Sequence, residues 1–149
     1  MKNLFNQEDT TEILNRVDNL KPTSQRLWGK MEVAQMLAHC SKTLEVATGQ
    51  KNLPRTFIGK VLGGIIKKIY SNEKPFEKNS PTDNYFKIIG QRNFETEKQK
   101  LKDSIQKFQT GGESKCTTHP HPFFGKLTPT EWSIGMHKHL DHHLRQFGG

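Results

Sequence analysis

Long apolar runs and cysteines are both scarce in this sequence, and each shortage narrows the class of protein. No stretch approaches the roughly 20 consecutive apolar residues of a membrane-spanning helix, so we expect no membrane span. Residues 1–9 also lack the apolar segment of a secretory signal. The two cysteines, Cys40 and Cys116, are too few for a disulfide framework and favour a reducing compartment. These absences together predict a cytoplasmic protein.

Apolar residues make up only 32% of the 149 residues, and the mean hydropathy is -0.80. A chain of this length is expected to form one domain, residues 1–149, with one modest core. The net charge is +8, but the lysines are spread along the chain without forming a long block. Such a spread is typical of solvated surfaces and argues against a nucleic-acid surface, while an anionic ligand or partner stays open.

Apolar residues recur at spacings of three and four in five stretches, and no stretch keeps a period of two. The pattern predicts helices over residues 7–20, 30–48, 54–70, 93–110 and 128–146 or 147. The last has the clearest start, because Thr128 can cap it, Pro129 suits its first position and Glu131 completes a capping box. Residues 85–89 could form a short extended piece within the loop that precedes the fourth helix.

The 54–70 helix is the least regular of the five, because Gly59, Gly63 and Gly64 weaken it. Its apolar side chains line one side: Phe57, Val61, Leu62, Ile65, Ile66 and Ile69. We expect that side to pack against the other helices. The alternative, suggested by the lysines at 60, 67 and 68, is a helix that lies on a membrane surface.

Four of the seven histidines fall in the last helix, and their spacing separates them. At about 100° per residue, His139 and His143 lie about 40° apart on the arc that also holds Trp132. That arc is expected to pack inward. The flank or solvent side is expected to hold other polar side chains of this helix: His137, Lys138, Asp141, His142 and Arg145.

Two buried imidazoles one helical turn apart need partners for their ring nitrogens, and one metal ion can serve both. The same spacing brings two ligands to one ion in helical zinc motifs. The alternative is a pair of core histidines bonded to buried polar groups. His39, which borders the apolar stripe of the 30–48 helix, is the best third ligand. Three imidazoles suit several divalent ions, of which we expect zinc or nickel.

Two segments resemble the DinB/YfiT-like superfamily of metal-binding four-helix bundles. They are residues 36–39, Met-Leu-Ala-His, and residues 139–146, His-Leu-Asp-His-His-Leu-Arg-Gln. The usual ending of the second motif, His-Arg-Gly-Gln, reads His-Leu-Arg-Gln here. Residues 121–127, 131–132 and 138–148 look like an uncharacterised branch of that superfamily.

The resemblance implies an all-α, antiparallel four-helix bundle of up-down-down-up topology, with an extra helix and loop in the long crossover. It also implies that His39, His139 and His143 are the metal ligands. Several members transfer small thiols, which implies a divalent-metal-dependent hydrolase or a transferase of a thiol or other small molecule. The alternative is a non-catalytic basic binding module or stress-response module with structural histidines.

Two further residues are candidates for a pocket around such a metal. His121 lies in a proline-rich loop before the last helix and is expected to act as an acid, a base or a pocket residue. Gln146 lies near the same helical face and is expected at the rim of the substrate pocket. Cys40 lies on the apolar stripe of the 30–48 helix and is expected to be an inert thiol. A homodimer stays open, although no helix face is plainly unused.

Overall fold

The computed structural model describes all residues, 1–149, and consists of helices, turns and loops with one isolated β-bridge, between His121 and Gly125. The five α-helices are α1 (Gln7–Asn19), α2 (Val33–Ala47), α3 (Phe57–Tyr70), α4 (Phe94–Gly111) and α5 (Pro129–Gln146). Two 3-10 helices, η1 (Asn84–Phe86) and η2 (Glu113–Lys115), lie in the loops. The prediction of five helices is confirmed. The predicted extended piece at 85–89 is wrong, because η1 occupies its beginning and the rest forms no strand. No helix has the length and apolar character that crossing a membrane requires.

Local capping explains where the two longest helices begin. The Asn93 side chain accepts a hydrogen bond from the backbone N–H of Thr96 at the start of α4. At the start of α5, Thr128 accepts from the N–H of Glu131 while the Glu131 carboxylate accepts from the N–H of Thr128. The capping box fixes where α5 begins, and therefore the direction in which its histidines point.

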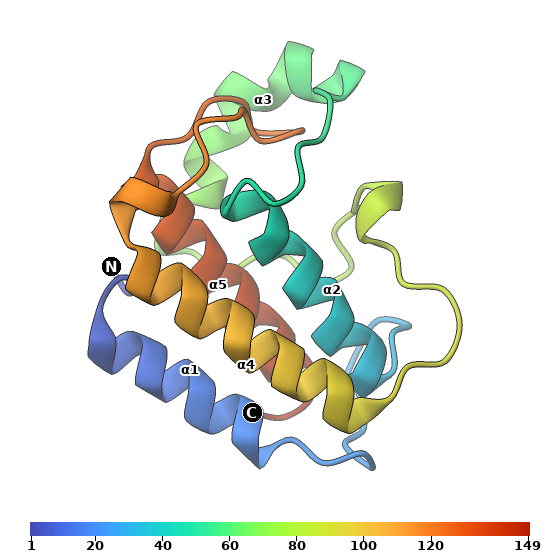
Figure 1. Ribbon diagram of the computed structural model, residues 1–149. Helices are drawn as coiled ribbons and strands as arrows, with labels where there is room; N and C mark the ends of the chain where they lie inside the picture. The colour runs from blue at the N-terminus through green and yellow to red at the C-terminus, as the bar shows by residue number, and fades with distance from the viewer.

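Four of the helices enclose the core. Helices α1 and α2 each contact both α4 and α5, so that apolar side chains from the two halves of the chain meet (Figure 1). One continuous cluster of 25 buried residues runs from Leu4 to Phe147 and includes Leu37, Leu101 and Trp132. This helical bundle places α2 and α5, which carry the candidate metal ligands, side by side.

Helix α3 lies at one end of the bundle (Figure 1). Most of the side chains on its apolar side are exposed and do not pack against the bundle. Phe57 is 81% exposed and Ile65 is 75% exposed. The glycine side faces the protein instead, because a Cβ atom at Gly59 would lie only 2.6 Å from the carbonyl oxygen of Pro122, and one at Gly63 would also clash. The prediction that the apolar side packs against the other helices is therefore wrong. Helix α3 packs instead through close backbone contact at its glycines.

Two neighbouring glycines of α3 test this arrangement. Gly63→Ala is expected to lower the free energy of unfolding by about 1–3 kcal/mol, because its Cβ would collide with the carbonyl oxygen of Phe123. Gly64→Ala is expected to raise it by about 0.5–1 kcal/mol, because its Cβ meets no atom within 4 Å and alanine favours the helix. Urea unfolding measures both changes. Equal changes would contradict the docking of α3 through its glycines.

The outer side of α5 is more covered than its sequence suggests. His137 is 6% exposed and Lys138 is 8% exposed, so the expectation that both face the flank or solvent is wrong. The N-terminal segment lies across α5, where the N–H of Leu4 donates to the carbonyl oxygen of Ser133. The Lys138 ammonium donates to the side-chain oxygen of Asn72 just beyond α3. Segments distant in sequence thus bury this side of α5.

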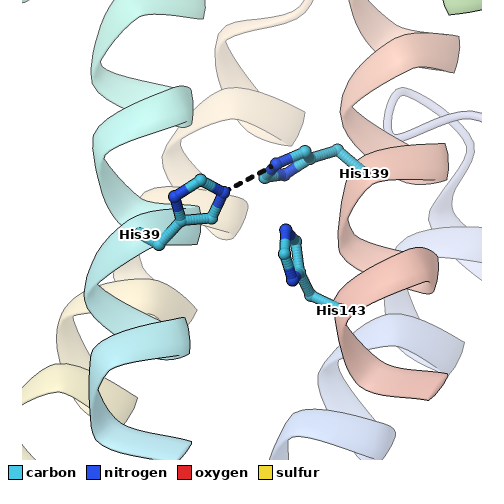
Figure 2. A group of neighbouring side chains, drawn as sticks. All are labelled: His39, His139 and His143. Atoms are coloured by element: carbon cyan, nitrogen blue, oxygen red, sulfur yellow. Dashed lines mark hydrogen bonds between the residues drawn. The ribbon is translucent and has the colours of Figure 1, made fainter. Parts of the chain in front are cut away.

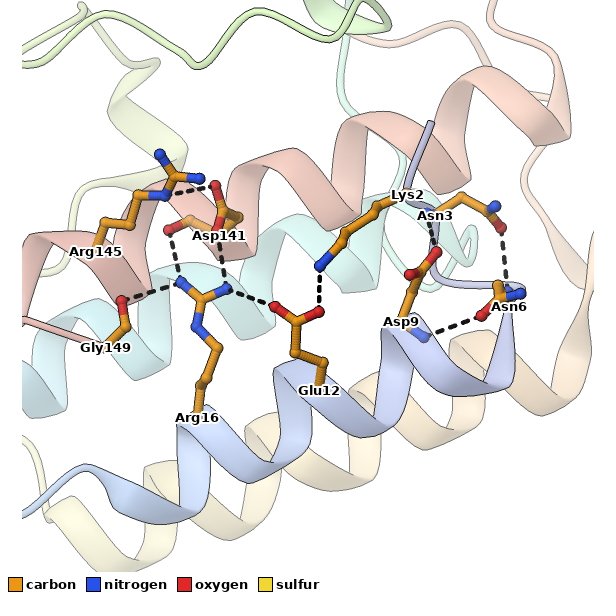
Figure 3. Close-up of polar contacts among 9 residues, drawn as sticks. All are labelled: Lys2, Asn3, Asn6, Asp9, Glu12, Arg16, Asp141, Arg145 and Gly149. Atoms are coloured by element: carbon orange, nitrogen blue, oxygen red, sulfur yellow. Dashed lines mark hydrogen bonds and ion pairs between the residues drawn. The ribbon is translucent and has the colours of Figure 1, made fainter.

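An ion-pair network joins α1 to the C-terminal half of α5 (Figure 3). Arg16 lies 2.8 Å from a carboxylate oxygen of Asp141, which also pairs with Arg145 at 3.0 Å. The Arg16 guanidinium also donates to the carbonyl oxygen of Gly149. Asp141 therefore serves the α1–α5 contact and, as its helical angle predicts, does not brace the imidazoles of His139 and His143.

Candidate metal centre

The three predicted ligands meet between α2 and α5. His39 comes from α2, and His139 and His143 come from successive turns of α5 (Figure 2). One ring nitrogen from each lies within 4.8 Å of the other two, and the two Nε2 atoms of His39 and His139 are 3.1 Å apart. The structure therefore brings together histidines 100 residues apart in sequence.

Hydrogen bonds fix the orientation of two of these rings. His39 donates from Nδ1 to the carbonyl oxygen of Phe86 at 2.9 Å. His143 donates from Nδ1 to the side-chain oxygen of Gln146 at 2.9 Å, and the Gln146 amide in turn donates to the carbonyl oxygen of Trp28. With Nδ1 protonated in both rings, each Nε2 carries a free lone pair.

The ring of His139 has a weaker hydrogen-bond partner at its Nδ1. The Thr43 hydroxyl donates to the carbonyl oxygen of Cys40 at 2.8 Å, so its oxygen is free to accept from His139. The distance from that oxygen to His139 Nδ1 is 3.5 Å, long for a hydrogen bond but correctly directed. One ring nitrogen of each histidine thus faces the other two, while Nδ1 of each ring faces an outer oxygen, as in metal sites whose ligands are held by outer hydrogen bonds.

Burial keeps these imidazoles neutral. It lowers the pKa of His39 and His139 from the ordinary value, and lowers the pKa of His143 to about 3. The neighbouring imidazoles lower the pKa of His139 and His143 further, because protonating one disfavours protonating the next. Neutral imidazole is the form that binds a metal ion, so the ligands need no deprotonation at neutral pH.

The geometry fits one divalent ion. Two nitrogen ligands at bond lengths of 2.0–2.1 Å in a tetrahedral site lie about 3.3 Å apart. The 3.1 Å between Nε2 of His39 and Nε2 of His139 is close to that separation. Two facing lone pairs at this distance repel unless a cation or a shared proton lies with them. A proton on one of these nitrogens gives the hydrogen bond drawn between the two rings in Figure 2, and a divalent ion would satisfy both lone pairs, so the donor set fits a metal.

Access to the cluster is uneven. His39 is 4% exposed and His143 is 8% exposed, whereas His139 is only half-buried. His139 is therefore the most exposed of the three rings. His121 is not one of the three converging ligands.

His121 is held in one orientation by its own loop. Its Nδ1 accepts hydrogen bonds from the backbone N–H groups of Phe123 and Phe124, at 3.0 and 3.2 Å. Burial lowers the pKa of His121 to about 3, so the ring is neutral and Nε2 carries the proton. The ring centroid lies 5.3 Å from that of Trp132 and 5.6 Å from that of Tyr70. His121 thus presents a hydrogen-bond donor within an aromatic cluster.

Several supporting groups escaped the sequence prediction. Thr43 lies one turn after His39 on the same face of α2, so its spacing contained a signal. The carbonyl oxygen of Phe86 is a backbone atom and has no signature in the residue type. Tyr70 packs directly on Gly135, one turn before His139, and the buried Tyr70 hydroxyl has no partner.

Gln146 is placed behind His143, with 3% of its surface exposed and both ends of its amide bonded. Gln146→Leu is therefore expected to weaken zinc binding about 10- to 100-fold, because His143 loses the acceptor that orients its ring. Competition with a chromophoric chelator measures the affinity. Gln106→Leu, at an exposed position of α4, is the matched control and should leave the affinity unchanged. Equal affinities in all three proteins would contradict this role of Gln146.

Comparison with known proteins gives one match. A family model described as "Protein of unknown function (DUF1569)" matches residues 2–148. No curated protein and no solved structure matches the chain significantly. The family description specifies no activity, so the chemistry has to be inferred from the residues of the site.

Proposed function

The chain belongs to the DUF1569 family, and we propose that it is a metalloenzyme that acts on a small molecule. Its one divalent ion, zinc or nickel, would be held by His39, His139 and His143. The observation that carries the proposal is the convergence of one nitrogen from each of three rings, while Nδ1 of each ring faces an outer oxygen. Structural histidines would need no such common direction.

The donor set suggests the class of reaction. Three neutral imidazoles leave the charge of a divalent ion uncompensated, and no carboxylate joins the cluster. A fourth ligand that is anionic or easily polarised is therefore favoured, as for a hydrolase or a thiol or small-molecule transferase. When bound, the ion would supply Lewis acidity at that fourth position. A low-molecular-weight thiol is one substrate of suitable chemistry.

The chain's own residues would orient the substrate on the open side of the site. His121 would donate a hydrogen bond from Nε2, since its Nδ1 is already occupied and its ring is neutral. The aromatic rings of Trp132 and Tyr70 would exclude water around it. Cys40 contributes no nucleophile, because it is fully buried and burial raises the pKa of its thiol.

The resemblance to the DinB/YfiT-like superfamily agrees with this proposal. On that interpretation α1, α2, α4 and α5 form an antiparallel four-helix bundle with up-down-down-up topology. Helix α3 and the loop after it would occupy the long crossover between α2 and α4. One ligand from the second helix and two from the last would then match the superfamily pattern.

Metal titration tests the proposal. The purified protein should bind one zinc or nickel ion per chain, and crystals should give an element-specific anomalous peak between α2 and α5. The cobalt(II) form tests the open position, because its visible spectrum should change when 2-mercaptoethanol is added. Absence of stoichiometric binding would overturn the metal site. A cobalt spectrum that no added thiol or azide alters would overturn the proposed catalytic role alone.

A further inference from the structure

Helix α3 exposes a contiguous apolar surface that no other part of the chain covers. We call it the α3 apolar face, and its members, each 45–81% exposed, are Phe57, Ile58, Val61, Leu62, Ile65 and Ile69. Single exposed apolar residues are ordinary, but a contiguous patch of this kind on a soluble chain usually marks an interaction site. The proposed enzyme chemistry does not use this face.

The segment that carries the face has charges of one sign. No aspartate or glutamate occurs between residues 46 and 72, whereas this stretch carries five basic residues: Lys51, Arg55, Lys60, Lys67 and Lys68. Lys67 pairs with Glu131, but Lys60 and Lys68 are exposed. Apart from the buried Tyr70 and the half-buried Ile66, the residues of α3 outside this face are only lysine and glycine. A partner that complements this surface is therefore apolar and anionic.

The position of α3 makes the face accessible to a broad surface. The helix lies at one end of the molecule, away from the core of the bundle, at the top of Figure 1. Its glycine side is fixed against residues 122–123, and its last residue, Tyr70, packs on Gly135. With about 100° per residue, the centre of the apolar arc lies roughly 130° from the glycine side, so the apolar side chains point away from the bundle.

We propose that the α3 apolar face docks the protein on an anionic membrane, with α3 lying in the plane of the lipid headgroups. An apolar face opposed to a lysine-rich polar side is typical of helices that bind in this way. Anionic lipid supplies an apolar layer in which the face can be buried and the negative charge that complements its lysines. A second copy of the chain fits less well, because two such faces would bring their lysines together without any acidic residue to pair with them.

Vesicle co-sedimentation of the full-length chain tests this proposal. The protein should bind vesicles of phosphatidylglycerol and phosphatidylcholine at low salt, and bind pure phosphatidylcholine vesicles at least tenfold more weakly. Val61→Asp/Ile65→Asp should remove binding, and Lys60→Glu/Lys68→Glu should reduce it about 30-fold or more. Ile89→Asp is the matched control, since Ile89 is 87% exposed but lies outside α3. All the substituted side chains are exposed, and circular dichroism checks that the variants are folded.

Three results would overturn the proposal. The first is no binding of the unaltered protein to anionic vesicles. The second is equal binding by Val61→Asp/Ile65→Asp and Ile89→Asp. The third is a dimer in sedimentation velocity that Val61→Asp/Ile65→Asp dissociates while neither form binds vesicles, which would assign the face to a second copy. The metal titration above is unaffected by each of these outcomes, so the two proposals fail separately.

Discussion

His139→Ala is expected to leave the purified protein with almost no metal and to weaken zinc binding by roughly 100- to 1,000-fold. A structural zinc site with four ligands contributes about 10–16 kcal/mol, so each ligand accounts for several kcal/mol. His139 is also the half-buried member of the cluster. Its loss removes a ligand and lets water approach the remaining two imidazoles. Elemental analysis and chelator competition measure the effect.

His137→Ala is the matched control for this experiment. It removes a buried histidine from the same helix, but one that does not belong to the converging cluster. Metal content should then stay at one ion per chain even if thermal stability falls. Full metal content in His139→Ala, or equal losses in both variants, would contradict the site formed by His39, His139 and His143.

The predictions that succeeded depend on local patterns. The capping residues around Thr128 fix the start of α5, and its angular spacing then places His139 and His143 on one face. Both observations need only neighbouring residues. His39 lies 100 residues away from His139. Its place beside the apolar stripe of its helix made it the best third candidate, and the resemblance of two distant segments implied the same residue.

The predictions that failed concern how elements are covered. Periodicity shows that Phe57 and Ile65 share a face of α3, but it cannot show whether another element lies against that face. Gly59 and Gly63 determine which side of α3 packs against the protein, because their lack of side chains lets a loop backbone approach closely. Likewise, the helical angle of His137 on α5 gave no information about the N-terminal segment that covers that side.

The supporting residues of the site are of two kinds. Gln146 could be found from the sequence because it lies one turn after His143. The sequence predicted a place at the rim of the substrate pocket, and in the structure Gln146 bonds to Nδ1 of His143. The carbonyl oxygen of Phe86 could not be found, because a backbone acceptor depends on where η1 lies and not on side-chain type. Tertiary placement of loops therefore limits what the sequence alone can predict about this site.

The metal-free protein is expected to lose stability steeply as the pH falls below about 6.5, and zinc is expected to move its acid unfolding to lower pH. Burial lowers the pKa of His39, His139, His143 and His121, the last two to about 3. In the unfolded chain these histidines protonate near pH 6.5. Between about pH 6.5 and pH 3 the unfolded state thus binds more protons, so stability rises with pH across that window.

Each histidine makes its full contribution to the free energy of unfolding above pH 6.5. Below that pH the contribution falls by up to about 1.4 kcal/mol per pH unit. Several such groups together can cancel the free energy of unfolding of a typical domain, about 5–15 kcal/mol, within two or three pH units. Zinc at 1,000 times its dissociation constant adds about 4 kcal/mol to the folded state, which lowers the unfolding pH. Urea unfolding at pH 7, 6 and 5, with zinc or with a chelator, measures both effects. His143→Leu should flatten the metal-free pH dependence, and an unchanged slope in that variant would show that His143 is not held neutral by the fold.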